Sequence, residues 1–429
     1  MNIRIAALAL ALSSLPAQAV AIDIAAARGA IAEARQLCEA DGRRLWNVSL
    51  CGPILLVDPA THDAVASAPG SGATLRADGD VFVGRLPDSV GIANTALDWD
   101  GTRWIALRWP LPDDAAARGR LLMHESWHRV QQVLGLPASS PSIAGLDSLD
   151  GRIRLRLEWR ALAAALSTHE DAARRQAIAD ALAFRAWRRS LDSHEAADEN
   201  ALELNEGLAE YTGRMLSGER DPLPGIVADL RDAENASSFV RSFAYHSGPA
   251  YGVLLDRYDA GWRGRLSTTS DLGALLATAA NVSASGDPTA AATRYDGRTV
   301  IDAERARDRA HRERLAAWRK QLVDGAVLVL PFADMHIQFD PNTLTALPPD
   351  GTVYPTLHIS DRWGVLDVER GALIDEGWSA VRVAAPKRVA ERHIAGDGWT
   401  LDLADGWSIV PATRKGDYTI AQDSAAAVR

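Results

Sequence analysis

The stretch His124-Glu125-Ser126-Trp127-His128 places two histidines four positions apart with a glutamate beside the first. If the stretch is helical, both imidazoles lie on one face and can bind one metal ion. Glu125 can then accept a proton from a water molecule at that ion. Apolar residues continue the helical pattern on both sides, and Gly135 and Pro137 end it. The alternative is an amphipathic helix whose two histidines and one glutamate face solvent or a polar partner.

A third ligand is expected from Leu204-Asn205-Glu206-Gly207-Leu208-Ala209-Glu210-Tyr211, because catalytic zinc usually has three protein ligands and one open position. This segment belongs to a predicted helix from about Glu195 to Leu216. Glu206 and Glu210 lie one turn apart on it, so one carboxylate can bind metal while the other accepts the free N–H of a ligand imidazole. The alternative is two surface glutamates on an acidic helix.

With these two segments the chain resembles the gluzincin metallopeptidases, which include thermolysin-like enzymes and the aminopeptidase-N type. The pattern Asn205-Glu206-Gly207-Leu208-Ala209-Glu210 is similar to that of their second zinc helix. The resemblance implies a mainly helical zincin-type domain with one Zn²⁺ bound by His124, His128 and Glu206. It also implies that Glu210 supports a zinc histidine and that Glu125 is the general base.

A third similarity begins at Tyr245-His246-Ser247-Gly248. The aminopeptidase-N type has a Tyr-x-x-Gly helix start whose tyrosine stabilises the oxyanion, and Tyr245 falls on that position. Thermolysin-like enzymes use a histidine for this role, so His246 is the alternative donor. The resemblance covers about a third of the chain, from Leu111 to Tyr258.

The chain departs from the aminopeptidase pattern in two ways. Glu206 comes 78 positions after His128, and the interval contains two further predicted helices, Ile153 to Leu166 and Asp171 to Leu191. The strand that anchors a substrate amine in those enzymes is also missing, because Gly91-Ile92-Ala93-Asn94-Thr95 has no glutamate. The choice between exopeptidase and endopeptidase therefore stays open.

The first 21 residues have the features of a secretory signal. Arg4 precedes an apolar run from Ile5 to Leu12, and Ala17-Gln18-Ala19 is a typical cleavage site. No other stretch is long and apolar enough for a membrane anchor. Export to an oxidising compartment predicts that the only two cysteines, Cys38 and Cys51, form a disulfide. Two buried free thiols are the alternative.

The net charge of −10 argues against nucleic acid and anionic membrane surfaces as partners. Basic residues are almost all arginine, with Lys320, Lys387 and Lys415 the only lysines, and alanine is abundant. This composition is typical of a GC-rich bacterial genome. We therefore expect a bacterial protein that is periplasmic or secreted; its oligomeric state cannot be predicted from the sequence.

The chain has an α+β pattern with four parts: a signal peptide (1–21), an α/β segment with strands leading to the active site (22–112), a helical metallopeptidase domain (113–325) and a small antiparallel β domain (326–429). In the second part we expect a helix from Ile24 to Ala40 and strands at Leu45–Val57, Val81–Gly84 and Trp99–Trp109. Another helix is expected over Asp302–Leu322. The predicted strands of the β domain are 326–330, 335–339, 353–359, 380–383, 399–403 and 407–410.

These observations predict an exported zinc metallopeptidase that hydrolyses a peptide or protein substrate with a zinc-activated water. An inactive binding module on a peptidase scaffold is one alternative, although the intact Glu125 argues against it. The other is a zinc hydrolase of a non-peptide amide, since the chemistry at zinc would be the same.

Overall fold

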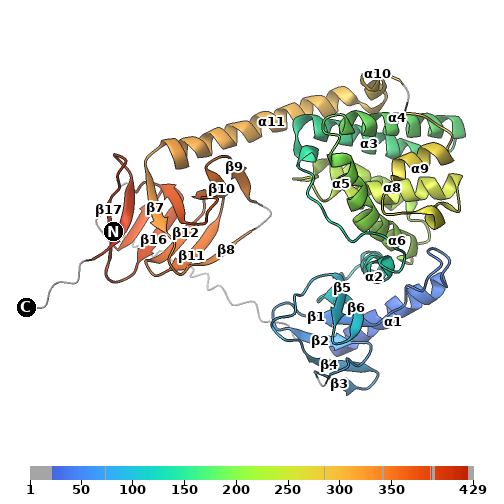
Figure 1. Ribbon diagram of the computed structural model, residues 1–429, viewed down its shortest axis with the longest axis horizontal. Coiled ribbons are helices and arrows are strands. Elements are labelled where there is room, and N and C mark those ends of the chain that lie inside the picture. Colours follow the sequence, from blue (N-terminus) through green and yellow to red (C-terminus); the bar gives the residue numbers. More distant parts are fainter. Residues whose placement is uncertain are drawn as a thin grey trace, which may run out of the picture. The chain divides into compact units, whose positions relative to one another are not determined.

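The computed structural model describes residues 22–72, 74–284, 286–340, 343–386, 388 and 392–423. The predicted signal peptide therefore lies outside the described residues. The chain divides into two compact units, one ending at Glu304 and the other running from Arg305 to Arg429. Helices form the middle of the chain and β-sheets lie in its N-terminal and C-terminal regions, which confirms the α+β prediction (Figure 1).

The first unit begins with one helix and a six-stranded sheet of order β3-β4-β2-β1-β6-β5. All neighbouring strands are antiparallel except β1 and β6, which are parallel. The elements are α1 (Ile24–Asp41), β1 (Ile54–Val57), β2 (Asp63–Ala66), β3 (Leu75–Asp78), β4 (Val81–Arg85), β5 (Thr95–Trp99) and β6 (Thr102–Arg108).

The predicted helix near Ile24 and the strand near Val81 are confirmed, but the long strand over Leu45–Val57 is wrong. Only Ile54–Val57 is a strand. Arg43 and Asn47 have positive φ, a conformation that strands do not use, and the disulfide between Cys38 and Cys51 closes this loop against α1. The predicted disulfide is therefore present.

The sheet contributes to the same core as the helices. Ile105 and Leu107 of β6 face the large cluster that also contains α1 and α2 residues. On the opposite face of the sheet Trp104 is fully buried in a smaller cluster. Both faces of β6 therefore pack in a core.

The helical part of the first unit follows β6. Its main helices are α2 (Ala115–Gln131), α3 (Leu149–Ser167), α4 (Asp171–Arg189), α5 (Glu195–Leu202), α6 (Leu208–Leu216), α7 (Leu223–Asp232), α8 (Phe243–Tyr258), α9 (Leu272–Ala279), α10 (Pro288–Ala292) and the start of α11 (Gly297–Arg319). Shorter helical turns of this unit are η1 (Ala144–Asp147), η2 (Glu203–Gly207), η3 (Ala233–Asn235), η4 (Trp262–Arg265) and η5 (Thr293–Tyr295), whereas the rest of α11 and the turn η6 (Lys320–Asp324) belong to the second unit. Among the described residues, no helix is long and apolar enough to cross a membrane.

The second unit contains two sheets that share one core, with strand orders β17-β18-β7-β14-β13-β10-β9 and β15-β16-β12-β11-β8. Its neighbouring strands are antiparallel apart from the parallel pair β18 and β7. The strands are β7 (Val327–Pro331), β8 (His336–Phe339), β9 (Thr345–Leu347), β10 (Gly351–Tyr354), β11 (Leu357–Asp361), β12 (Gly364–Val368), β13 (Ala372–Ile374), β14 (Ala380–Ala384), β15 (His393–Gly396), β16 (Trp399–Leu403), β17 (Trp407–Pro411) and β18 (Tyr418–Gln422).

One predicted strand of this unit, Val353–Ile359, is wrong. It is two strands, β10 and β11, which belong to different sheets. Pro355 lies between them and cannot donate a ladder hydrogen bond, so the chain leaves one sheet there and enters the other.

Candidate metal centre

Helix α2 positions His124, Glu125 and His128. Asp114 caps its first turn by accepting a hydrogen bond from the backbone N–H of Ala117 at 2.8 Å. The helix contacts β5 and β6 on one side and α6 on another. His124 and Glu125 are consequently buried, with 6% and 4% of their surfaces exposed.

The predicted helix from Glu195 to Leu216 is one helical run interrupted by a π turn. Residues Glu203–Gly207 form this turn, η2, between α5 and α6. Helix α6 packs closely on α2, because Gly213 lies so near the backbone that a Cβ there would be 2.6 Å from the Arg120 carbonyl oxygen. This close approach brings Glu206 and Glu210 to the two histidines.

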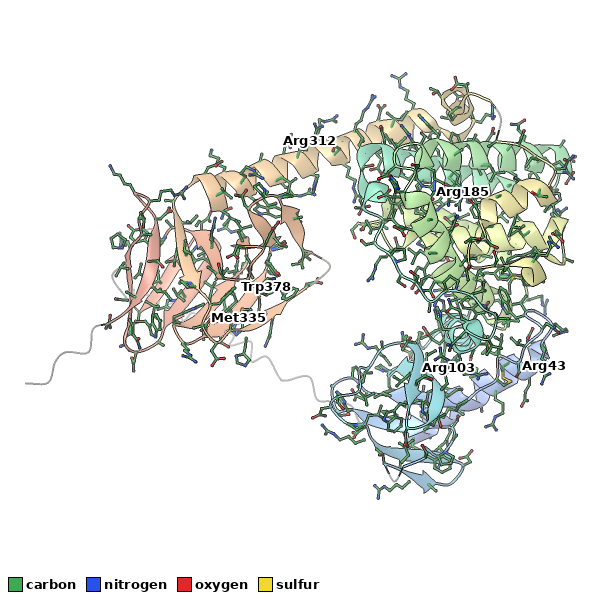
Figure 2. All side chains as sticks on the ribbon, in the orientation of Figure 1. Arg43, Arg103, Arg185, Arg312, Met335 and Trp378 are labelled. Carbon is green, nitrogen blue, oxygen red and sulfur yellow. A yellow bond between two sulfur atoms is a disulfide. The ribbon has the colours of Figure 1, made fainter. Side chains whose placement is uncertain are left out.

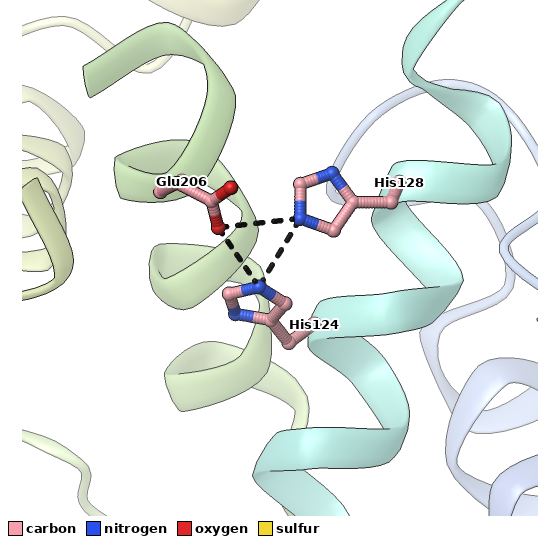
Figure 3. Close-up of side chains that lie close together, drawn as sticks. All are labelled: His124, His128 and Glu206. Atoms are coloured by element: carbon pink, nitrogen blue, oxygen red, sulfur yellow. Dashed lines mark hydrogen bonds and ion pairs between the residues drawn. The ribbon is translucent and has the colours of Figure 1, made fainter. Parts of the chain in front are cut away.

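Three ligand atoms converge between these helices (Figure 3). The Nε2 atoms of His124 and His128 are 3.2 Å apart, and each lies 3.5 Å from Oε2 of Glu206. Ligands at 2.0–2.1 Å from one tetrahedral ion would be separated by about 3.3 Å. The three residues could therefore hold a metal ion.

The hydrogen bonds around the imidazoles favour the same conclusion. Nδ1 of His124 lies 3.1 Å from a carboxylate oxygen of Glu210, and Nδ1 of His128 lies 2.9 Å from the amide oxygen of Gln131. Each Nδ1 faces an acceptor and therefore donates, so when both imidazoles are neutral each Nε2 presents a lone pair to the other. Two facing lone pairs at 3.2 Å require a proton or a cation between them.

Asn205 and Ser140 hold the second carboxylate oxygen of Glu206. The Asn205 amide N–H donates to it at 2.9 Å and the Ser140 hydroxyl donates at 3.3 Å. The amide oxygen of Asn205 in turn accepts from Gln131 at 2.9 Å. Hydrogen bonds therefore connect His128 to Glu206 through two side-chain amides. Gln131, which lies one helical turn after His128, was not predicted from the sequence.

Helix α8 brings Tyr245 to the same place. Gly248 of α8 touches the π turn backbone to backbone, since a Cβ on it would be 2.2 Å from Cα of Gly207. The Tyr245 hydroxyl donates to Oε2 of Glu206 at 2.6 Å, and its ring stacks on His124. His246 is not among the residues that line the cavity described below, and its Nδ1 is buried with no hydrogen-bond partner among the described residues.

The electrostatic environment is dominated by burial and by close carboxylates. Burial raises the pKa of Glu125, whose Oε2 atom is buried with no hydrogen-bond partner among the described residues. Burial opposes the charged form of Glu206 too, but hydrogen bonds from His124, His128 and Tyr245 lower its pKa. For His124, burial is outweighed by Glu206 and Glu210, which raise its pKa to about 10. Burial lowers the pKa of His246 to about 4.

A cavity of about 970 Å³ opens at these residues and includes Glu125, Glu210 and Tyr245 in its lining. The edge strand β5 contributes Thr95, Ala96 and Asp98 to it. The structure therefore brings together every predicted site residue except the alternative donor His246.

Comparison with protein-family models, with curated proteins and with solved structures gives no match for this chain.

Proposed function

We propose that the chain is an exported zinc-dependent metallopeptidase that hydrolyses peptide bonds. The observation that supports this most is the convergence of His124, His128 and Glu206 within 3.5 Å, beside a buried glutamate, in an open cavity. Two imidazoles and one carboxylate are the donor set of catalytic zinc sites with an open position. The Cys38–Cys51 disulfide is consistent with export.

Zinc bound by these three residues would polarise a substrate carbonyl and lower the pKa of a water molecule to about 7. Glu125 lines the cavity next to the first ligand and has an unpartnered oxygen. It accepts a proton from the attacking water and gives it to the leaving nitrogen. The hydroxyl oxygen joins the carbonyl carbon and the C–N bond breaks, so the products are a carboxylic acid and an amine, and transfer of the acid's proton to the amine gives a carboxylate and an ammonium group.

Tyr245 donates its hydroxyl proton in a hydrogen bond to the carbonyl oxygen as negative charge develops there. In the structure this hydroxyl is bonded to Glu206, whose same oxygen faces both histidines. If that oxygen bound a cation instead, the Tyr245 hydroxyl would lose this acceptor and would be free to donate to substrate. Peptide as substrate is supported by β5, an edge strand on the cavity to which an extended backbone can add.

The test is metal analysis together with peptide hydrolysis by wild type, Glu125→Gln and the exposed control Glu219→Gln. We expect about one zinc per chain in all three proteins. Peptide turnover should fall by about 10²–10⁴-fold in Glu125→Gln alone, because only that variant loses the general base. A peptide hydroxamate should inhibit the wild type.

Unchanged turnover in zinc-loaded Glu125→Gln would exclude the mechanism. A zinc-loaded wild type that leaves a peptide library intact but hydrolyses a non-peptide amide would reassign the substrate class. Tight peptide binding without turnover would identify a binding module instead.

A further inference from the structure

A buried group of charges lies behind the metal centre, among α3, α4, α5 and η2. Arg185 of α4 lies within the helical part of the first unit (Figure 2) and donates from both terminal nitrogens to Glu203, at 2.8 and 2.5 Å. Glu203 is fully buried and Arg185 is 3% exposed. Arg188, one turn later on α4, donates from two nitrogens to Glu199, which lies one turn before Glu203, at 3.1 and 3.0 Å.

Glu203 is the first residue of the π turn that contains Glu206. In a regular α-helix, with about 100° per residue, side chains at positions 203, 206 and 210 would share one face. Here Glu206 and Glu210 face the histidines of α2, whereas Glu203 faces Arg185 of α4. The wider turn, closed by a bond from the Leu208 N–H to the Glu203 carbonyl, rotates Glu203 away from the other two carboxylates.

We propose that Arg185 and Glu203 are positioning residues, whose buried ion pair holds the π turn in the form that directs Glu206 at the histidines. A π turn is less stable than a regular helical turn and needs contacts to persist. An arginine that binds a carboxylate through two nitrogens (a bidentate ion pair) fixes both the position and the plane of that carboxylate, here that of Glu203. This inference rests on the proposed metal site.

The proposal gives a role to the 78-position interval between the second and third ligands. Helices α3 and α4 belong to that interval. They pack against each other, and α4 supplies Arg185, while Glu158 of α3 accepts from Arg185 and Arg188. The interval thus builds the surface against which the third ligand's helix is held.

The test compares Glu203→Gln with Glu199→Gln in the full chain. The control is closely matched, because Glu199 is also buried and also bound by two nitrogens of an α4 arginine, but lies outside the π turn. Zinc affinity is measured by competition with a chromogenic chelator, and coordination geometry by the visible absorption of the cobalt(II) form. We expect both variants to lose thermal stability. Only Glu203→Gln should lose zinc affinity, by about 10–100-fold, with an altered cobalt spectrum.

A double variant, Arg185→Leu with Glu203→Leu, covers the case in which Glu203→Gln does not fold, because it leaves no unpaired buried charge. It should also bind zinc more weakly than wild type. Wild-type affinity in Glu203→Gln or in the double variant would overturn the inference, as would equal loss in Glu199→Gln. A wild type with no zinc affinity would overturn the metal site as well, so the two failures are distinguishable.

Discussion

Tyr245 and His246 are neighbours on α8, but the tyrosine lines the cavity and the histidine does not. Tyr245→Phe removes the hydroxyl that reaches Glu206 and leaves the ring stacked on His124. We expect kcat to fall by about 10²–10³-fold with little change in KM or zinc content, because the bond to the carbonyl oxygen forms mainly in the transition state. Steady-state kinetics on zinc-loaded protein measures this. A larger loss in His246→Ala would reassign the role to the histidine.

Gln131 is the acceptor that fixes which nitrogen of His128 carries the proton. Gln131→Leu removes that acceptor and also the donor to Asn205. We expect zinc affinity to fall by about 10–100-fold, as for other groups that orient a metal ligand. Gln131→Glu keeps an acceptor for His128 and should bind zinc more tightly than Gln131→Leu. The exposed neighbour provides the control, since Gln132→Leu should leave affinity unchanged, and full affinity in Gln131→Leu would contradict the prediction.

At the scale of residues, the sequence predicted the groups that chemistry restricts most. Because His124 and His128 are four positions apart on a helix, both imidazoles had to lie on one face, where they can bind the same metal ion. The structure places Glu206 and Glu210 beside them. Gln131 and Ser140 were not predicted, because glutamine and serine are common on helices and loops and only tertiary contact gives them a partner.

At the scale of elements, two glycines determine how closely α8 approaches the π turn. Gly248→Ala would place its Cβ 2.2 Å from Cα of Gly207, so the helices must move apart. We expect a loss of about 1–3 kcal/mol in unfolding free energy from this overpacking, and weaker catalysis because Tyr245 moves with α8. Gly29→Ala on the exposed face of α1 is the control, because nothing lies within 4 Å of its added Cβ. It should be neutral or stabilising by up to about 1 kcal/mol. Denaturant unfolding measures the unfolding free energy of both variants. Wild-type stability in Gly248→Ala would refute the role of this contact.

The elements that the sequence predicted well are those with a strong local pattern, such as α1 and β4. The π turn was not predicted, because Glu203 to Gly207 have the same helical pattern as the residues around them and the extra residue per turn is selected by Arg185 and Gly248 from other helices. The division of Val353–Ile359 at Pro355 was not predicted, because β10 and β11 have the same local strand pattern and differ only in their partners: β10 pairs with β9 and β13, and β11 pairs with β8 and β12.

At the scale of the whole molecule, the disulfide ties α1 to the loop that contacts α2. The carbonyl oxygen of Cys51 accepts a hydrogen bond from Arg129, which follows His128. We expect Cys38→Ala with Cys51→Ala to lose about 3 kcal/mol of unfolding free energy, since the closed loop is short. Zinc content should stay near that of wild type because neither cysteine is a ligand. Mass analysis of exported wild type should show a chain two hydrogen atoms lighter than its reduced form, and free thiols there would contradict the disulfide.

Metal binding should also be visible in the stability of the first unit, because His124, His128 and Glu206 come from helices that only the folded chain brings together. A ligand that binds the folded state at a thousand times its Kd stabilises it by about 4 kcal/mol. We therefore expect a chelator to lower the Tm of this unit by on the order of 10 °C in calorimetry of the full chain. The second unit has its own core and no predicted ligand among its described residues, so heat absorption from Arg305–Arg429 should not respond. Without chelator, the first unit of His128→Ala should already have the lower Tm, and adding the chelator should not change it. An equal chelator response in His128→Ala and wild type would show that the stabilising metal binds elsewhere.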